Sequence, residues 1–375
     1  MNSESLAVRP ARKSLIEVLG LTVFILYFAV YVISNSSMTF EASESPAKHL
    51  VMVAAASLSL LLLPMQALRS LLIFAPLAII YLLGSLPAYA LMVLVFAVAL
   101  PLLSRGIHLL IERRQIDIVV LCALIAFVPA LLAMLTSEPD PLFSTYYGRP
   151  RLLLGYWHPK EAAASLAVPI FMYLMIRGRD VPHLAMVLLP AFLWVVGSRN
   201  MALAMYLAIG VRFFPKWTFS IIGITLAGLA IFLLTSNNSY DMLDELISLR
   251  LTAWRDGLAG PVQFNSTDLI GVERFAIDSY YVEVFLISGY AGLLLLFSWA
   301  IFFYIQYIRP LHRDTWSRAL FIAILFFAAF DSGIVSTGNV FHVLAWVFIG
   351  VPIFKRHQRQ LPELLQSNQA PPILV

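Results

Sequence analysis

Apolar runs of about 17–25 residues recur along nearly the whole chain, and they constrain its fold more than any other feature. A helix rises about 1.5 Å per residue, so a run of this length crosses the roughly 30 Å hydrocarbon core of a bilayer. Of the 375 residues, 61% are hydrophobic and only 12% are charged, which excludes an ordinary soluble domain. The sequence therefore predicts an all-α polytopic membrane protein.

The runs are expected to form a single transmembrane domain, residues 1–354, with about twelve helices. The first run is too long for the apolar region of a signal peptide, so it is predicted to be an uncleaved span. Residues 355–375 are predicted to form a polar cytoplasmic tail without fixed structure. The expected spans are 15–34, 50–66, 70–86, 88–104, 116–136, 161–177, 182–197, 200–214, 217–235, 279–305, 318–336 and 340–354.

The distribution of lysine and arginine predicts the orientation, because cytoplasmic connections are enriched in these residues. With the N-terminus in the cytoplasm, the connections on that side hold 17 of the 25 cations. Both termini are therefore predicted to be cytoplasmic. The remaining cations are Lys48, Arg149, Arg151, Lys160, Arg199, Arg250, Arg255 and Arg274.

Most of these outer cations lie in two predicted periplasmic loops, 137–160 and 236–278. Snorkelling to headgroups explains any one of them, but their clustering favours an anionic substrate, since arginine pairs two phosphate oxygens at once. Residues 240–258 of the longer loop have the periodicity of an amphipathic helix. Arg250 shares its apolar face, so this arginine is the one expected to meet a lipid-borne anion.

No motif for a metal, a nucleotide or a nucleic acid is visible, and the seven histidines are scattered. We therefore predict no metal and no cofactor. Two carboxylates stand out at the start of the span after the long loop, Asp278 and Glu283. A charged carboxylate inside a membrane is costly in free energy. Each of the two acids is therefore expected either to have a functional role or to form a structural ion pair. The nearby Ser288 and Gly292, four residues apart, predict close helix packing.

The same stretch resembles a family of bacterial membrane proteins, the O-antigen ligases and the O-antigen, capsule or exopolysaccharide polymerases. The ligases have a His followed by Asn, Ser or Gln, then nine residues and Gly-x-x-Gly. Here Asp278 and Ser279 precede nine residues and Gly289-Tyr290-Ala291-Gly292. The spacing matches that of the ligase motif, but Asp stands in place of His. An acid at this position resembles the polymerase branch of the family.

Three further stretches are similar to the family, and the detailed resemblance covers residues 140–305. RPRLLLGYWHPKEAAASLAVP (149–169) is similar to its Arg, Gly and His-Pro-Asn segment, with Lys160 in place of Asn. GSRNMALA (197–204) is similar to its Ser-Arg turn, and SLRLTAWRDGL (248–258) to its Arg-x-x-x-Trp element.

The resemblance implies a metal-independent glycosyltransferase of the bacterial inner membrane that acts at the periplasmic face. Glycan on undecaprenyl diphosphate would be transferred to a second lipid-linked repeat unit. The implied partners are this lipid-linked oligosaccharide, membrane lipid, a glycan flippase and a chain-length regulator. The implied catalytic residues are Asp278, with Glu161 and Glu283 in reserve. The implied substrate-binding residues are Arg199, Arg250, Arg149, Arg151 and His158.

Two alternatives remain open at this stage. One is an O-antigen ligase that transfers glycan to lipid A-core, against which the Asp in place of His argues. The other is a polytopic glycan or lipid transporter, because twelve spans with both ends inside also describe many secondary transporters. Transporters are typically built from repeats with helices broken at mid-membrane, and no internal repeat is visible.

Overall fold

The computed structural model describes residues 8–37, 46–136, 142–146, 149–196, 198–235, 279–311, 315–329, 334–335 and 339–367. Within these residues the chain forms helices and one hairpin of two short strands, β1 (Phe143–Tyr146) and β2 (Arg149–Leu152). The helices are α1 (Val8–Ser34), α2 (Ala47–Leu62), α3 (Pro64–Leu83), α4 (Pro87–Glu112), α5 (Ile116–Leu135), α6 (Pro159–Arg177), α7 (His183–Val195), α8 (Arg199–Phe213), α9 (Pro215–Thr235), α13 (Tyr280–Phe303), α14 (Thr315–Ala328) and α15 (Val340–Ser367).

Each expected span overlaps one of these helices, and the helical membrane architecture is confirmed. Six helices in the described residues have the length and apolarity needed to cross a membrane: α1, α3, α4, α5, α6 and α13. Helices α2, α7, α8 and α14 and the apolar part of α15 are shorter, so twelve crossings stay a prediction. Four helices begin at a proline, namely α3, α4, α6 and α9. Proline has no N–H to leave unsatisfied and its φ suits the first helical turn.

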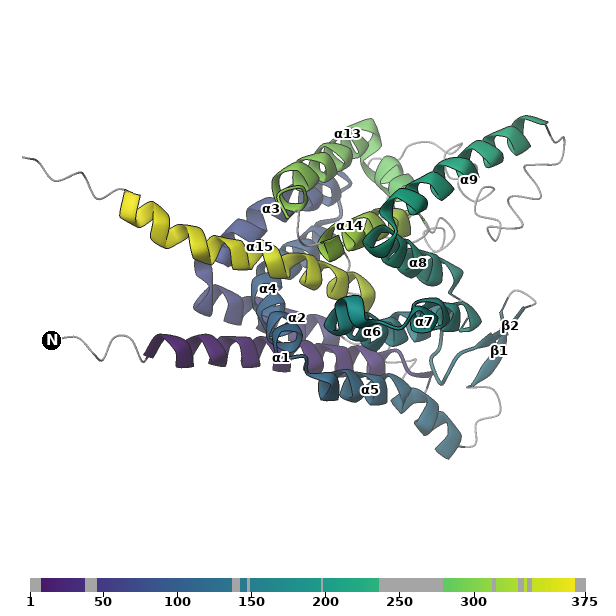
Figure 1. Cartoon of the computed structure of the whole chain (residues 1–375), viewed down its shortest axis with the longest axis horizontal. Coiled ribbons are helices and arrows are strands. Elements are labelled where there is room, and N and C mark those ends of the chain that lie inside the picture. Colours follow the sequence, from purple (N-terminus) through teal and green to yellow (C-terminus); the bar gives the residue numbers. More distant parts are fainter. Residues whose placement is uncertain are drawn as a thin grey trace, which may run out of the picture.

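Consecutive helices run up and down, which gives the bundle two ends. In Figure 1 the N-terminus of α1 and the C-terminal part of α15 extend from one end, and the strands lie at the other. We call these the N-terminal end and the hairpin end. The Tyr281 hydroxyl donates to the carbonyl of Leu325 (2.7 Å), which joins the start of α13 to the end of α14. At the N-terminal end, Arg69 of α3 lies 5.5 Å from the ring centroid of Tyr307, just beyond α13.

The expectation for the C-terminal tail is corrected by the described residues. The tail was expected to lack structure from Lys355, but α15 continues to Ser367. Once a helix is nucleated, each further residue adds a hydrogen bond at small cost, so the helix extends past its apolar part. The all-α fold class is confirmed, and the described strands add only a short hairpin in which Phe143 pairs with Leu152. The loop 236–278, with its expected amphipathic helix, lies outside the described residues.

Glycines bring α1 and α4 into backbone contact. A Cβ on Gly20 would lie 2.2 Å from the carbonyl oxygen of Leu102, and a Cβ on Gly106 would lie 2.1 Å from the backbone nitrogen of Leu21. No side chain larger than hydrogen fits between these backbones. Small residues serve membrane helices in this way, because van der Waals contact drives their association in lipid.

Helix α13 is broken at Gly289, where φ is 63° and ψ is −157°. This conformation is essentially restricted to glycine. The break lies about 13 Å along the helix from Tyr280, close to half the depth of the hydrocarbon core. Ser288 and Gly292, where close packing was expected, are both buried. The atoms nearest to a Cβ on Gly292 belong to the same helix, the Ser288 hydroxyl first. Glycine at 292 leaves room for the Ser288 side chain beside the break.

Candidate functional site

The Glu161 carboxylate lies at the hairpin end, in the first turn of α6. His158 caps this helix, since its Nδ1 accepts a hydrogen bond from the backbone N–H of Lys160 (3.1 Å). An acid is stabilised in a first turn by the partial positive charge of the helix N-terminus. The hydroxyl of Tyr31, on the last turns of α1, donates to Oε2 of Glu161. The Tyr31 side chain is fully buried.

The segment that precedes α6 ties the start of this helix to the end of α1. The backbone N–H of Ser37 donates to the carbonyl of Gly155 (2.8 Å), and that of Trp157 donates to the carbonyl of Asn35 (3.3 Å). Gly155 has a φ of 78°, and a Cβ there would lie 2.1 Å from the carbonyl oxygen of Pro129 in α5. Only glycine therefore allows this segment to pass so close to α5 and to place Glu161 against Tyr31.

Other ionisable groups surround this pair. The rings of Tyr27 and Tyr31 lie 6.4 Å apart between centroids, and the Lys48 ammonium lies 6.0 Å from the Tyr31 centroid. Burial raises the pKa of Tyr156 above its usual range, so this phenol stays protonated and donates to the carbonyl of Ala126 (2.8 Å). We call Glu161, Tyr27, Tyr31, Lys48, Tyr156 and His158 the Glu161 cluster.

Three of the arginines predicted to bind substrate also lie in the described residues. Arg149 and Arg151 stand two positions apart on β2, paired with Tyr146 and Ser144 of β1. Arg199 is the first residue of α8 and is half-buried. Strand β2, which carries both residues, lies at the hairpin end (Figure 1) and is followed in the chain by α6, whose first turn holds Glu161. Arg250 lies outside the described residues.

The other two candidate acids have different settings. Glu283 is 6% exposed in the first turn of α13, before the Gly289 break. Its neighbour Tyr280 lies against Tyr81 at the end of α3, with ring centroids 6.3 Å apart. Glu283 therefore sits in an aromatic environment of α3 and α13. Asp278 lies outside the described residues, so its predicted catalytic position stays a prediction.

Sequence reasoning assigned no role to Tyr31, Tyr27 or Lys48. Lys48 carried a weak signal, because it was counted among the outer cations. Tyr31 carried none, since a tyrosine near a span end is common at membrane interfaces. Tyr31 meets Glu161 only through a hydrogen bond between helices, across 130 positions of the sequence.

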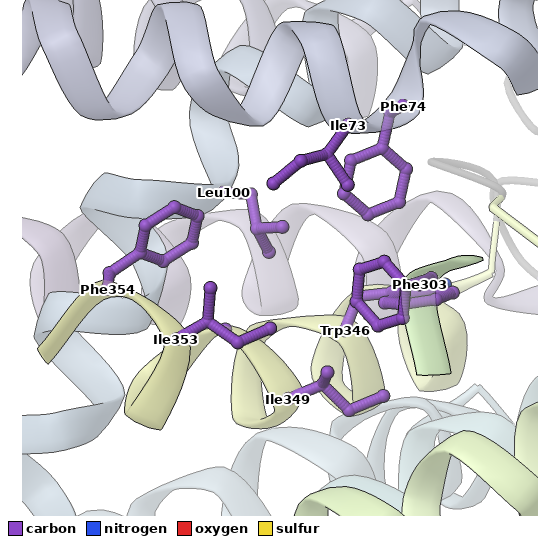
Figure 2. Close-up of a pocket in the computed structure, with 9 residues that line it drawn as sticks. Ile73, Phe74, Leu100, Phe303, Trp346, Ile349, Ile353 and Phe354 are labelled. Atoms are coloured by element: carbon purple, nitrogen blue, oxygen red, sulfur yellow. The ribbon is translucent and has the colours of Figure 1, made fainter. Parts of the chain in front are cut away.

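A small cavity between α3, α4, α13 and α15 is a poor candidate for polar chemistry. Figure 2 shows its lining of apolar and aromatic side chains, Phe74, Phe303 and Trp346 among them. The Trp346 Nε1 already donates to the carbonyl of Ile334 (2.8 Å). In the described part of the chain, no three His, Cys, Asp or Glu side chains are grouped to hold a metal ion.

The chain was compared with models of protein families, with curated proteins and with solved structures, and none of the three comparisons finds a match.

Proposed function

We propose that the chain is a polysaccharide polymerase of a bacterial inner membrane, a metal-independent glycosyltransferase of the O-antigen polymerase and ligase type. The observation that carries the proposal is the Glu161–Tyr31 pair, a hydrogen-bonded carboxylate at the hairpin end, with the Lys48 ammonium over the Tyr31 ring. Arg149 and Arg151 lie on the strand that leads toward this acid. An acid to take a proton and cations to hold a diphosphate are the two requirements of the reaction.

In the proposed topology, twelve spans cross the membrane, both termini are cytoplasmic and the hairpin end is periplasmic. The cations of the N-terminal end support it. Arg212 lies 5.7 Å from the ring centroid of Trp316, and Arg69 is similarly close to Tyr307. Trp and Tyr are enriched at both membrane interfaces, whereas Lys and Arg are enriched on the cytoplasmic side, so the arginines favour a cytoplasmic N-terminal end.

The proposed donor is a glycan on undecaprenyl diphosphate, and the proposed acceptor is a hydroxyl group on a second lipid-linked repeat unit. The hydroxyl oxygen attacks the anomeric carbon, whose bond to the diphosphate oxygen breaks, with inversion. Glu161 takes the hydroxyl proton as general base, and the diphosphate leaves with the bonding electrons. Arg149, Arg151 and Arg199, together with Arg250 in the long loop, stabilise the charge on the leaving group.

Asp278 and Glu283 remain the other carboxylates for the catalytic role. Asp278 has the motif position of the family, and Glu283 is buried on the broken helix. Of the three acids, we assign the base to Glu161 because its carboxylate accepts a hydrogen bond from a buried phenol. A glycan flippase and a chain-length regulator are the proposed protein partners.

A transporter is the second candidate, and the break at Gly289 is the observation that favours it. Discontinuous helices bind substrates near the bilayer midplane in many secondary transporters. A ligase that transfers glycan to lipid A-core uses the same donor chemistry and is distinguished from a polymerase by its acceptor.

Deletion of the gene separates the three functions, and the measurement is mass spectrometry of lipid-linked glycans in intact and lysed cells. Loss of a polymerase should leave single repeat units on undecaprenyl diphosphate at the periplasmic face. Loss of a ligase would leave long chains on the same lipid, and loss of a flippase would leave single units at the cytoplasmic face. We expect the first pattern, and either of the others would reject the polymerase.

A further inference from the structure

Residues that take part in the proposed reaction extend beyond the stretch 140–305 in which the family resemblance lies. Helix α1 contributes Tyr31, which donates to Glu161, and helix α2 contributes Lys48, which lies over the Tyr31 ring. We infer that Tyr31 is a positioning residue that holds the Glu161 carboxylate in the orientation and charge state needed for proton transfer. The inference rests on the proposed function, which it deepens.

The geometry that supports this role begins with the hydrogen bond itself. A carboxylate on a glutamate side chain rotates about several bonds, and a general base must lie within hydrogen-bond reach of the proton it takes. Donation by Tyr31 fixes one of the two oxygens, Oε2, of Glu161. A hydrogen bond to an ionised acceptor is roughly twice as strong as one between neutral groups, so it restricts the side chain effectively.

Tyr31 is itself held in place from several sides. Its side chain is fully buried, and its backbone carbonyl accepts a hydrogen bond from Nδ2 of Asn35 (2.8 Å). Asn35 in turn accepts at Oδ1 from Nε1 of Trp157, 3.3 Å away in the segment before α6. The ammonium of Lys48 lies over the Tyr31 ring. The phenol is therefore a fixed donor from α1 to an acid on α6.

The charge state of Glu161 depends on the same contact. A donor to the ionised form of a carboxyl group favours that form, and the positive end of α6 acts in the same direction. Tyr27 of α1 and Tyr156 before α6 interact electrostatically with Glu161. Lys48 of α2 lies over the Tyr31 ring, and His158 caps the helix that carries Glu161. Removal of the Tyr31 hydroxyl should therefore shift the protonation of Glu161 to higher pH.

The test is Tyr31→Phe, which deletes one oxygen atom and keeps the ring over which Lys48 lies. In purified protein with lipid-linked repeat units, we expect kcat to fall about 10- to 100-fold, as for the loss of one hydrogen bond to a charged group. The KM should change less than about threefold, because Tyr31 acts through Glu161. The acidic limb of the pH–rate profile should move to higher pH.

Tyr206→Phe is the matched control, because the Tyr206 hydroxyl donates to a backbone carbonyl, that of Val187 (2.7 Å). This variant should keep the wild-type kcat and pH profile. An equal loss of rate in both variants, or a lower kcat in Tyr31→Phe without a shift of the profile, would reduce Tyr31 to a structural residue and overturn the inference.

A second measurement does not depend on turnover. The carboxyl band of Glu161 is identified in infrared difference spectra by its loss in Glu161→Gln, and its titration is compared in the wild-type protein and in Tyr31→Phe. We expect the midpoint to rise in the variant, and an unchanged midpoint would overturn the inference. A raised midpoint in a protein that transfers no glycan would refute the proposed function and leave the Tyr31–Glu161 coupling intact.

Discussion

Glu161→Gln should lower glycan transfer by about 10²- to 10⁴-fold, the usual contribution of a general base. The amide oxygen still accepts a hydrogen bond from Tyr31, so the protein should reach the membrane and keep its thermal stability. The loss should appear in kcat, because the proton is removed only as the new bond forms. The measurement is the initial rate of chain elongation by purified protein.

Glu112→Gln is the control for this prediction. Glu112 ends α4 at the N-terminal end, where its carboxylate lies 3.4 Å from the Nδ1 of His108 and is 60% exposed. Removal of this charge should leave the rate unchanged. Wild-type elongation by a folded Glu161→Gln protein would assign the base to Asp278 or Glu283, and Asp278→Asn and Glu283→Gln measured in the same assay would then identify it.

Gly106→Val should be the most damaging single change in the packing of the bundle. The first added carbon would lie 2.1 Å from the backbone nitrogen of Leu21 and 2.3 Å from the carbonyl carbon of Gly20. Backbone atoms cannot rotate away as a side chain does, so α1 and α4 must separate. Overpacking in cores costs about 1–3 kcal/mol and occasionally more, and we expect the upper part of this range.

The measurement is the midpoint of thermal unfolding in detergent, with Gly228→Val as the control. A Cβ on Gly228 of α9 would meet no atom within 4 Å, so its replacement should shift the midpoint little. Because α1 also carries Tyr31, Gly106→Val should reduce activity even where protein survives. Equal midpoints for both variants would contradict the close contact of α1 and α4.

The helices were predictable because their cause is local. An apolar run in hydrocarbon must satisfy its own backbone hydrogen bonds, and a helix does so within one segment. Each expected span therefore overlaps a helix, and prolines such as Pro64 and Pro87 define where helices begin. The extension of α15 beyond its apolar part was missed, because helix propagation past Phe354 leaves little trace in hydropathy.

The arrangement of the site was less predictable, because it depends on which helices touch. Glu161 was a reserve candidate, but its partner Tyr31 lies 130 positions earlier in the chain. No periodicity in either segment specifies that contact. Close packing was expected at Ser288 and Gly292, and both residues are buried. The break of α13 at Gly289 was not predicted, because hydropathy and spacing carry no sign of the positive φ there.

The most direct test of the central claim is reconstitution of the purified protein in liposomes with repeat units on undecaprenyl diphosphate, without nucleotide sugars. If the protein is a polymerase, gels should show a ladder of longer glycans on the lipid, with one undecaprenyl diphosphate released for every bond formed. If the repeat units stay single and no undecaprenyl diphosphate is released, the account is contradicted. If these single repeat units also move between the two leaflets, the protein is a transporter instead.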